Sequence, residues 1–189
     1  MRAAVLVIDM IKDTFEEMTG DSLTEYARAF LPALNHLIEV ARKENSPVIF
    51  ASDSFLKEDF IFNSKLKPHA IRGTQGVEVI NDILRGPNDI SMEKRRFSAF
   101  IKTDLDQSLR TLSIDTVVVT GIATTFCILS TVFDALSHDF KTIIIEDCTA
   151  AHDKKIHQIY MDIYRDSPLY PLLRVLSADE FINIANCQQ

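Results

Sequence analysis

Six short segments of this chain carry strand-like patterns, and most of them are continuous runs of apolar, β-branched residues. They lie at residues 3–8, 47–52, 89–92, 116–120, 141–146 and 172–176. A run that is apolar throughout predicts a strand covered on both faces, and parallel neighbours need crossover connections. The pattern therefore predicts a three-layer α/β/α sandwich around a six-stranded, mostly parallel sheet.

Segments with helical spacing or helix-capping signals separate the strands. We expect helices near residues 23–44, 77–84, 103–112, 125–137 and 151–165, with a last one from Ser177. The irregular stretch from Ser54 to Gly76 is the longest expected loop, and such a loop in a compact domain is usually functional. The length of 189 residues fits a single domain, 1–189, with a substantial core.

Composition excludes several classes of partner. The net charge of −7 argues against binding to nucleic acid or an anionic membrane, because the densest basic cluster is only Lys94-Arg95-Arg96. No apolar run is long enough to cross a membrane, and no signal peptide is apparent. The three cysteines are widely spaced and form neither a CxxC pair nor a disulfide framework. A reducing, cytoplasmic setting is the expectation.

Four reactive side chains lie at or just beyond the carboxyl ends of expected strands: Asp9, Asp53, Lys94 and Cys127. In an open parallel sheet these ends meet at one edge, where ligand sites form. The residues after Gly121 predict a tight turn and a helix with Cys127 in its first turn. The helix dipole there biases a thiol toward thiolate, although most free cysteines merely pack.

An acid, an amine and a thiol make a coherent nucleophilic set. A carboxylate beside a thiol can take its proton, and an ammonium lowers the thiol pKa and pairs with the carboxylate. Each residue also has an inert alternative. Asp9 could be a cap at the end of a strand, Lys94 a solvated surface charge, and Cys127 a buried apolar residue. All three alternatives would have to hold together for the site to carry no chemistry.

This arrangement resembles the isochorismatase-like cysteine hydrolases, a superfamily that includes the nicotinamidases. The resemblance runs from Val5 to Phe181 and rests on segments Ile8–Met10, Glu93–Phe100 and Gly121–Cys127. It implies a Rossmann-like fold and a small-molecule amide as substrate. Relatives often form dimers or larger assemblies, so a homo-oligomer is expected.

The resemblance also implies a role for each matching residue. Asp9 would be the general base, Lys94 the cation that braces the thiolate, and Cys127 the nucleophile. The family places a cis peptide bond at the position of Ile122-Ala123. The backbone N–H groups of Ala123 and Cys127 would then form an oxyanion hole.

The metal site implied by the resemblance is incomplete. Nicotinamidases carry Asp-x-His after the second strand and a further loop histidine, which here correspond to Asp53, Phe55 and His69. Zinc therefore stays an open expectation with Asp53 and His69 as ligands and an oxygen of Asn63 or Asp59 as a third. The structural alternative for His69 is a hydrogen-bonding role. The remaining histidines, interpreted as surface or packing residues, are His36, His138, His152 and His157.

Four phenylalanines lie close in sequence to the reactive segments and could wall a pocket for a flat amide: Phe15, Phe55, Phe97 and Phe126. In such positions phenylalanine is more often plain core. Nicotinamide is the leading expected substrate. A metal-independent hydrolase of a carbamoyl or ureido amide is the alternative, and a binding module without turnover is a third.

Overall fold

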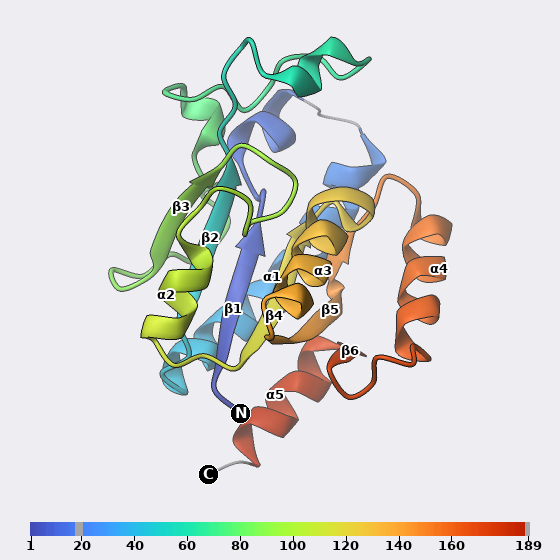
Figure 1. Cartoon of the computed structure of the whole chain (residues 1–189). Helices are drawn as coiled ribbons and strands as arrows, with labels where there is room; N and C mark the ends of the chain where they lie inside the picture. Colours follow the sequence, from blue (N-terminus) through green and yellow to red (C-terminus); the bar gives the residue numbers. More distant parts are fainter. Residues whose placement is uncertain (18–20, 188–189) are drawn as a thin grey trace.

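The computed structural model describes residues 1–17 and 21–187, and in these ranges it contains one sheet of parallel strands in the order β3-β2-β1-β4-β5-β6 (Figure 1). The strands are β1 (Ala3–Ile8), β2 (Val48–Asp53), β3 (Ile90–Lys94), β4 (Thr116–Ile122), β5 (Lys141–Ala150) and β6 (Leu173–Leu176). Each pair of neighbouring strands in this sheet is parallel. The predicted α/β fold is confirmed, and the sheet is parallel throughout rather than mostly.

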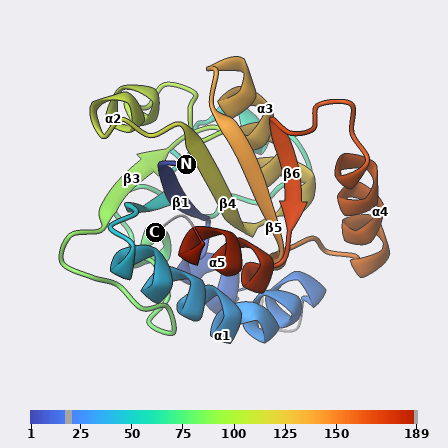
Figure 2. The same ribbon diagram turned by 90° about the horizontal axis from the view of Figure 1, so that it is seen from below.

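Helices cover both faces of the sheet. They are α1 (Ser22–Lys43), α2 (Leu105–Thr111), α3 (Leu129–Ser137), α4 (Lys154–Arg165) and α5 (Ala178–Asn186). Figure 2 shows α1 and α5 on one side of the sheet, α2 and α3 on the other, and α4 beyond β6. Among the described residues, no helix is long and apolar enough to cross a membrane.

The central strand β1 shows why an all-apolar run gives this fold. Alternate strand residues point to opposite faces, so Val5 and Val7 pack in the core under α1, and Leu6 and Ile8 pack in the core under α3. Each of these side chains is at most 1% exposed. Burial of one such side chain contributes about 1.5–3 kcal/mol to the free energy of unfolding. An edge position would expose some of these side chains, so the centre of the sheet is favoured for β1.

The helix expected at residues 77–84 does not form. This stretch instead pairs with the segment after β1: Lys12 N donates to Glu78 O at 2.9 Å, and Ile80 N donates to Met10 O at 3.0 Å. These backbone bonds are made to a distant segment and replace the bonds that a helix would make within itself. A 3₁₀ turn, Gln75–Val77, precedes them.

The carboxyl ends of the strands point to one edge, over which the segment from residue 54 to 76 passes (Figure 1). Asp9 follows β1 in the left-handed region, with φ 54°, a conformation that Asp tolerates better than most residues. Gly121, near the end of β4, has φ 103°, and a Cβ there would lie 2.1 Å from Ile8 O. Glycine is required because β4 passes directly against β1 beside Asp9.

Candidate active site

The ammonium of Lys94 is the centre of the site. Lys94 ends β3, is 1% exposed, and meets three groups from three other segments. Its Nζ lies 2.5 Å from Asp53 Oδ1, 2.9 Å from Asp9 Oδ2 and 3.4 Å from Cys127 Sγ. The structure thus brings together all four strand-end residues, which we call the charged cluster. A buried ammonium is tolerated only when paired, and here two carboxylates pair with it.

The two oxygens of Asp9 have different surroundings. Oδ1 accepts a hydrogen bond of 2.7 Å from the backbone N–H of Asp53, which fixes the carboxylate against the end of β2. Oδ2 faces Lys94 and, within the described part of the chain, accepts no hydrogen bond of good geometry. Sγ of Cys127 and oxygens of the two carboxylates all lie within 4.8 Å of one another. Asp9 Oδ2 therefore keeps a lone pair close to the thiol.

The charges of the cluster set the protonation of each member. Burial alone would lower the pKa of Lys94, but Asp9, Cys127 and Asp53 outweigh it and raise that pKa well above its usual value, so the lysine stays an ammonium. Burial, followed by the charge of Asp9, raises the pKa of Asp53 to about 7 against the opposing effect of Lys94. At neutral pH the cluster therefore holds one firm cation and one carboxyl poised to gain or lose a proton.

The thiol differs from the sequence-based expectation. Burial and the negative charge of Asp9 raise the pKa of Cys127 well above its usual value, and the neighbouring Lys94 only partly offsets them. The resting form is the thiol, not the thiolate that a helix N-terminus favours. Desolvation and a nearby carboxylate outweigh the helix dipole here. Attack by Cys127 consequently needs a base in contact, and Asp9 is placed for that role.

Cys127 lies in a single π-helical turn, Thr124–Ile128, that leads into α3. The turn follows a cis peptide bond between Ile122 and Ala123, as the resemblance implied. The Ala123 carbonyl accepts hydrogen bonds from the N–H groups of Phe126 at 3.0 Å and Ile128 at 3.3 Å. The amides of Ala123 and Cys127 thus stand at the start of a tight turn beside the thiol. The oxyanion-hole role of these two amides stays a prediction.

The four phenylalanines divide into two pairs. Phe15 and Phe55 are each 1% exposed, Phe15 in the core under α1 and Phe55 in a small cluster with Ile11 and Ala70. Their expected place in a pocket wall is wrong, because both are buried in cores. Phe97 and Phe126 are 40% and 51% exposed, and their ring centroids are 5.6 Å apart. Of the two pairs, this second one presents an aromatic surface. Phe97 lies three residues after Lys94, and Phe126 immediately precedes Cys127.

The residues that would bind zinc do not assemble. The ring of His69 packs edge-on against Phe55 and Phe62, an arrangement we call the aromatic cluster, with centroids 5.7 and 5.9 Å away. His69 Nδ1 lies 2.9 Å from Lys67 O. Asp53 pairs with Lys94 instead, so these two predicted ligands do not form a site with each other.

The substitute oxygen ligands do not complete a site either. Asp59 is held by the guanidinium of Arg95 and by Leu56 N at 2.8 Å, and Asn63 is exposed. Within the described ranges, the group of three metal-binding side chains placed close together is Asp9, Asp53 and Cys127, which excludes His69. An ammonium already neutralises that group, so a divalent ion there would meet a resident cation. The donors do not fit a zinc site.

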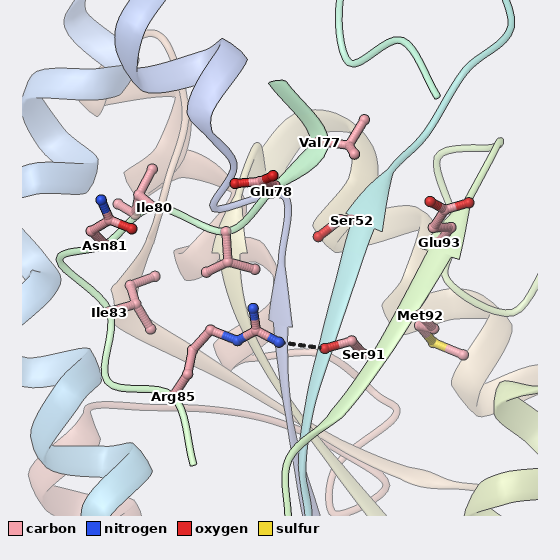
Figure 3. A pocket seen from close by; sticks show the side chains of 11 residues that line it. Ser52, Val77, Glu78, Ile80, Asn81, Ile83, Arg85, Ser91, Met92 and Glu93 are labelled. Carbon is pink, nitrogen blue, oxygen red and sulfur yellow. Dashed lines mark hydrogen bonds between the residues drawn. The ribbon is translucent and has the colours of Figure 1, made fainter. Parts of the chain in front are cut away.

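A cavity of about 510 Å³ opens near the same edge of the sheet, on the face opposite the charged cluster (Figure 3). Its lining includes Ser52 and Glu93, the residues that precede Asp53 and Lys94. Because neighbouring strand residues point to opposite faces, this cavity and the charged cluster lie on different sides of β2 and β3. The cavity is therefore not the space that a substrate of Cys127 would fill.

Sequence reasoning missed one contact of the nucleophile turn. His157, on α4, places Nδ1 at 2.9 Å from the hydroxyl of Thr124, which is fully buried at the start of the turn. His157 is half-buried, whereas His36 and His152 are exposed, and His138 stacks on Phe100. No local pattern marks the Thr124–His157 pair, since 33 residues separate its members.

Comparison with known proteins places this geometry in a family. The sequence model of the isochorismatase domain family matches residues 3–173 of this chain. A probable inactive nicotinamidase from Arabidopsis thaliana is 32% identical over 82% of this chain and 83% of its own length. The ureidoacrylate amidohydrolase RutB of Caulobacter vibrioides is 26% identical, over 88% of this chain and 82% of its own.

Solved structures agree with the fold. An isochorismatase-like hydrolase from Alkaliphilus metalliredigens is 29% identical with a TM-score of 0.84, covering 97% of this chain and 99% of its own. N-carbamoylsarcosine amidase from Thermoplasma acidophilum is 29% identical with a TM-score of 0.81, covering 95% and 98%. A pyrazinamidase from Pyrococcus horikoshii, solved in complex with zinc, is 19% identical and shows the fold alone (TM-score 0.79, 94% and 99% covered). The chain belongs to the isochorismatase family and is a cysteine hydrolase of that family.

Proposed function

We propose that this protein hydrolyses the C–N bond of a small amide through a thioester on Cys127, with no metal ion in the reaction. One observation carries the proposal. The buried ammonium of Lys94 lies against the thiol of Cys127 and against the carboxylate of Asp9, which can deprotonate that thiol. The resemblance of the chain to two amidohydrolases of known structure or name, the carbamoylsarcosine amidase and RutB, supports the reaction class.

The first half-reaction forms the thioester. Asp9 takes the proton of Cys127 as sulfur attacks the amide carbon, since the raised thiol pKa leaves little thiolate at rest. Lys94 remains protonated and offsets the negative charge that passes from Asp9 to sulfur. The N–H groups of Ala123 and Cys127 would stabilise the oxyanion of the tetrahedral intermediate. The C–N bond then breaks, and the nitrogen leaves with the proton held by Asp9.

The second half-reaction restores the enzyme. Asp9 accepts a proton from water, the resulting hydroxide attacks the thioester carbonyl, and the C–S bond breaks. The proton returns to sulfur, so Cys127 again carries a thiol and the product is a carboxylic acid. Every proton in this cycle moves between Asp9, the sulfur, water and the leaving nitrogen.

Nicotinamide is the first substrate to test. Phe97 and Phe126 offer an exposed aromatic pair that can contact a flat ring, and one curated relative is named for nicotinamidase activity, although as inactive. The carboxyl and thiol that the reaction needs are both present here. Their presence argues against a binding module without turnover.

A ureido or carbamoyl amide is the second candidate, and the failed zinc site favours it. A pyridine ring has no metal to bind because Phe55 fills the ligand position and His69 packs on it. The relatives that act on such groups by name are the carbamoylsarcosine amidase and RutB.

An ammonia-release assay over a panel of amides tests the proposal. The panel contains nicotinamide, pyrazinamide, an N-carbamoyl amino acid and a ureido acid, each with wild type and with Cys127→Ala. We expect ammonia from at least one compound with wild type and from none with the variant. Equal release by both proteins, or no release from any compound, would reject the proposed activity.

A further inference from the structure

The turn that carries Cys127 has little side-chain support at its start. Ala123, which precedes the turn, makes no side-chain capping bond, and the turn is closed by backbone bonds to the Ala123 carbonyl. The next residue, Thr124, is fully buried. Its hydroxyl must be hydrogen-bonded there, because an unpaired buried hydroxyl costs about 1–3 kcal/mol.

The partner of Thr124 comes from a different element. His157 reaches from the first turn of α4, and its Nδ1 lies 2.9 Å from Thr124 Oγ1. Burial lowers the pKa of His157, against the opposing effects of a backbone hydrogen bond to Glu146 and the Glu146 charge. A neutral imidazole has one N–H and one acceptor nitrogen. A ring that carries its proton on Nε2 accepts at Nδ1 from the Thr124 hydroxyl, which lies at hydrogen-bonding distance.

This contact joins the nucleophile turn to two neighbours at once. Glu146 lies in β5, where the pairing with β4 shifts register between Val119 and Gly121. The imidazole therefore lies between the start of the turn, to which it is hydrogen-bonded, and the irregular part of β5, whose Glu146 charge affects its pKa. Asp153 fixes the start of the helix that carries His157, since its side chain accepts from Lys155 N and Ile156 N and its carbonyl accepts from His157 N.

We propose that the Thr124–His157 hydrogen bond positions the Cys127 turn for attack, which makes both residues positioning residues of this site. The contribution of this bond to catalysis rests on the proposed amidohydrolase function. Its effect on the position of the thiol is independent of that function, because the reactivity of Cys127 toward an alkylating agent depends on the same turn. A shift of the turn by a fraction of an ångström would move sulfur relative to both Asp9 and Lys94, and small misplacements of this kind slow reactions by large factors.

The test compares variants that keep or remove the bond. Thr124→Val has the shape of threonine without its hydroxyl, Thr124→Ser keeps the hydroxyl, and His157→Phe removes the acceptor. His152→Phe is the matched control, as an exposed histidine five residues before His157 whose ring nitrogen faces Asp21 and not the turn of Cys127. Each protein is assayed for ammonia release and for iodoacetamide labelling of Cys127, followed by mass spectrometry, with Tm measured alongside.

We expect Thr124→Val and His157→Phe to lower kcat about 10- to 100-fold with KM within about twofold, and to slow labelling of Cys127 to a similar extent. Thr124→Ser should stay within about threefold of wild type, as should the control. The double variant should be no worse than either single one, because both remove the same bond. Wild-type labelling in Thr124→Val, or strictly additive losses, would overturn the proposal.

The two readouts separate the two claims. Labelling needs no substrate, so slow labelling in Thr124→Val and His157→Phe with wild-type rates in Thr124→Ser supports positioning even if wild type releases no ammonia. In that case the proposed function fails and the positioning role stands. Equal losses in Thr124→Ser and Thr124→Val would mean that packing, not the hydrogen bond, places the turn.

Discussion

The charged cluster and the aromatic cluster lie at the same edge of the sheet and have opposite character. In the charged cluster four ionisable groups are buried: Lys94 is paired with the carboxylates of Asp9 and Asp53, and Cys127 stays a neutral thiol. In the aromatic cluster, to which the resemblance assigned two metal ligands, three rings pack edge-to-face and Phe55 is 1% exposed.

The difference between the two clusters shows which of them keeps groups that can react. Buried charge is costly unless it is paired, so a fold that keeps Lys94 between two carboxylates does so at the expense of core apolar burial. The aromatic cluster gains that burial and supplies no set of metal ligands among the described residues. At position 55, to which the resemblance assigned a ligand, the phenylalanine packs in a small core. If this difference governs the reaction, function should follow the charged cluster alone.

The largest effect is expected at Cys127. Cys127→Ala and Cys127→Ser should each lose about 10³-fold or more of turnover, because Cys127 is the one thiol among the described residues that lies against Lys94. The matched control is Cys148→Ala: Cys148 is fully buried in the core under α1, where burial raises its pKa, and it should keep wild-type kcat. More than a few per cent activity in a folded Cys127→Ala protein would break the comparison.

Asp53 should make stability depend on pH. Its pKa is about 7 in the folded protein and 3.8 for a free group, so between about pH 4 and 7 the folded state holds more protons than the unfolded state. The free energy of unfolding therefore falls as pH rises through this window, by at most about 1.4 kcal/mol per pH unit. Urea titrations of wild type and Asp53→Asn at several pH values measure it. The decline should be weaker in Asp53→Asn, and parallel curves would contradict the prediction.

A smaller effect is expected at the exposed aromatic pair. Phe126→Ala should raise KM about three- to tenfold for an aromatic amide and leave Tm within a few degrees, because the ring is half-exposed. Phe126→Tyr keeps the ring and serves as the control. A large drop in kcat without a change in KM would show that Phe126 acts on the turn of Cys127 and not on substrate.

The smallest effect is expected from removing metal. Activity on the best amide of the panel should survive dialysis against a strong chelator, and His69→Ala should remain within about threefold of wild type, since His69 packs with rings and faces Lys67 O. Phe55→His supplies the missing ligand. If wild type loses activity in chelator and zinc restores it, or if Phe55→His gains both bound zinc and nicotinamide turnover, the aromatic cluster is a metal site after all.

Sequence alone determined the fold and the members of the charged cluster. All-apolar runs such as Val117–Val119 can be satisfied only between two layers, and the strand order then brings Asp9, Asp53, Lys94 and Cys127 to one edge. These inferences depend on local patterns and on general rules of parallel sheets, both of which a single sequence contains. A single domain and a homo-oligomer stay predictions.

Tertiary structure decided what depends on distant neighbours. Residues 77–84 form backbone bonds to Met10 and Lys12 instead of a helix. The thiol of Cys127 is held protonated by burial and by Asp9, and Phe55 lies in a core instead of a pocket wall. Desolvation, charge pairing and packing act through space, between residues far apart in the chain. A sequence pattern shows which residues can meet at the edge of the sheet, but only the assembled neighbours fix their protonation and their partners.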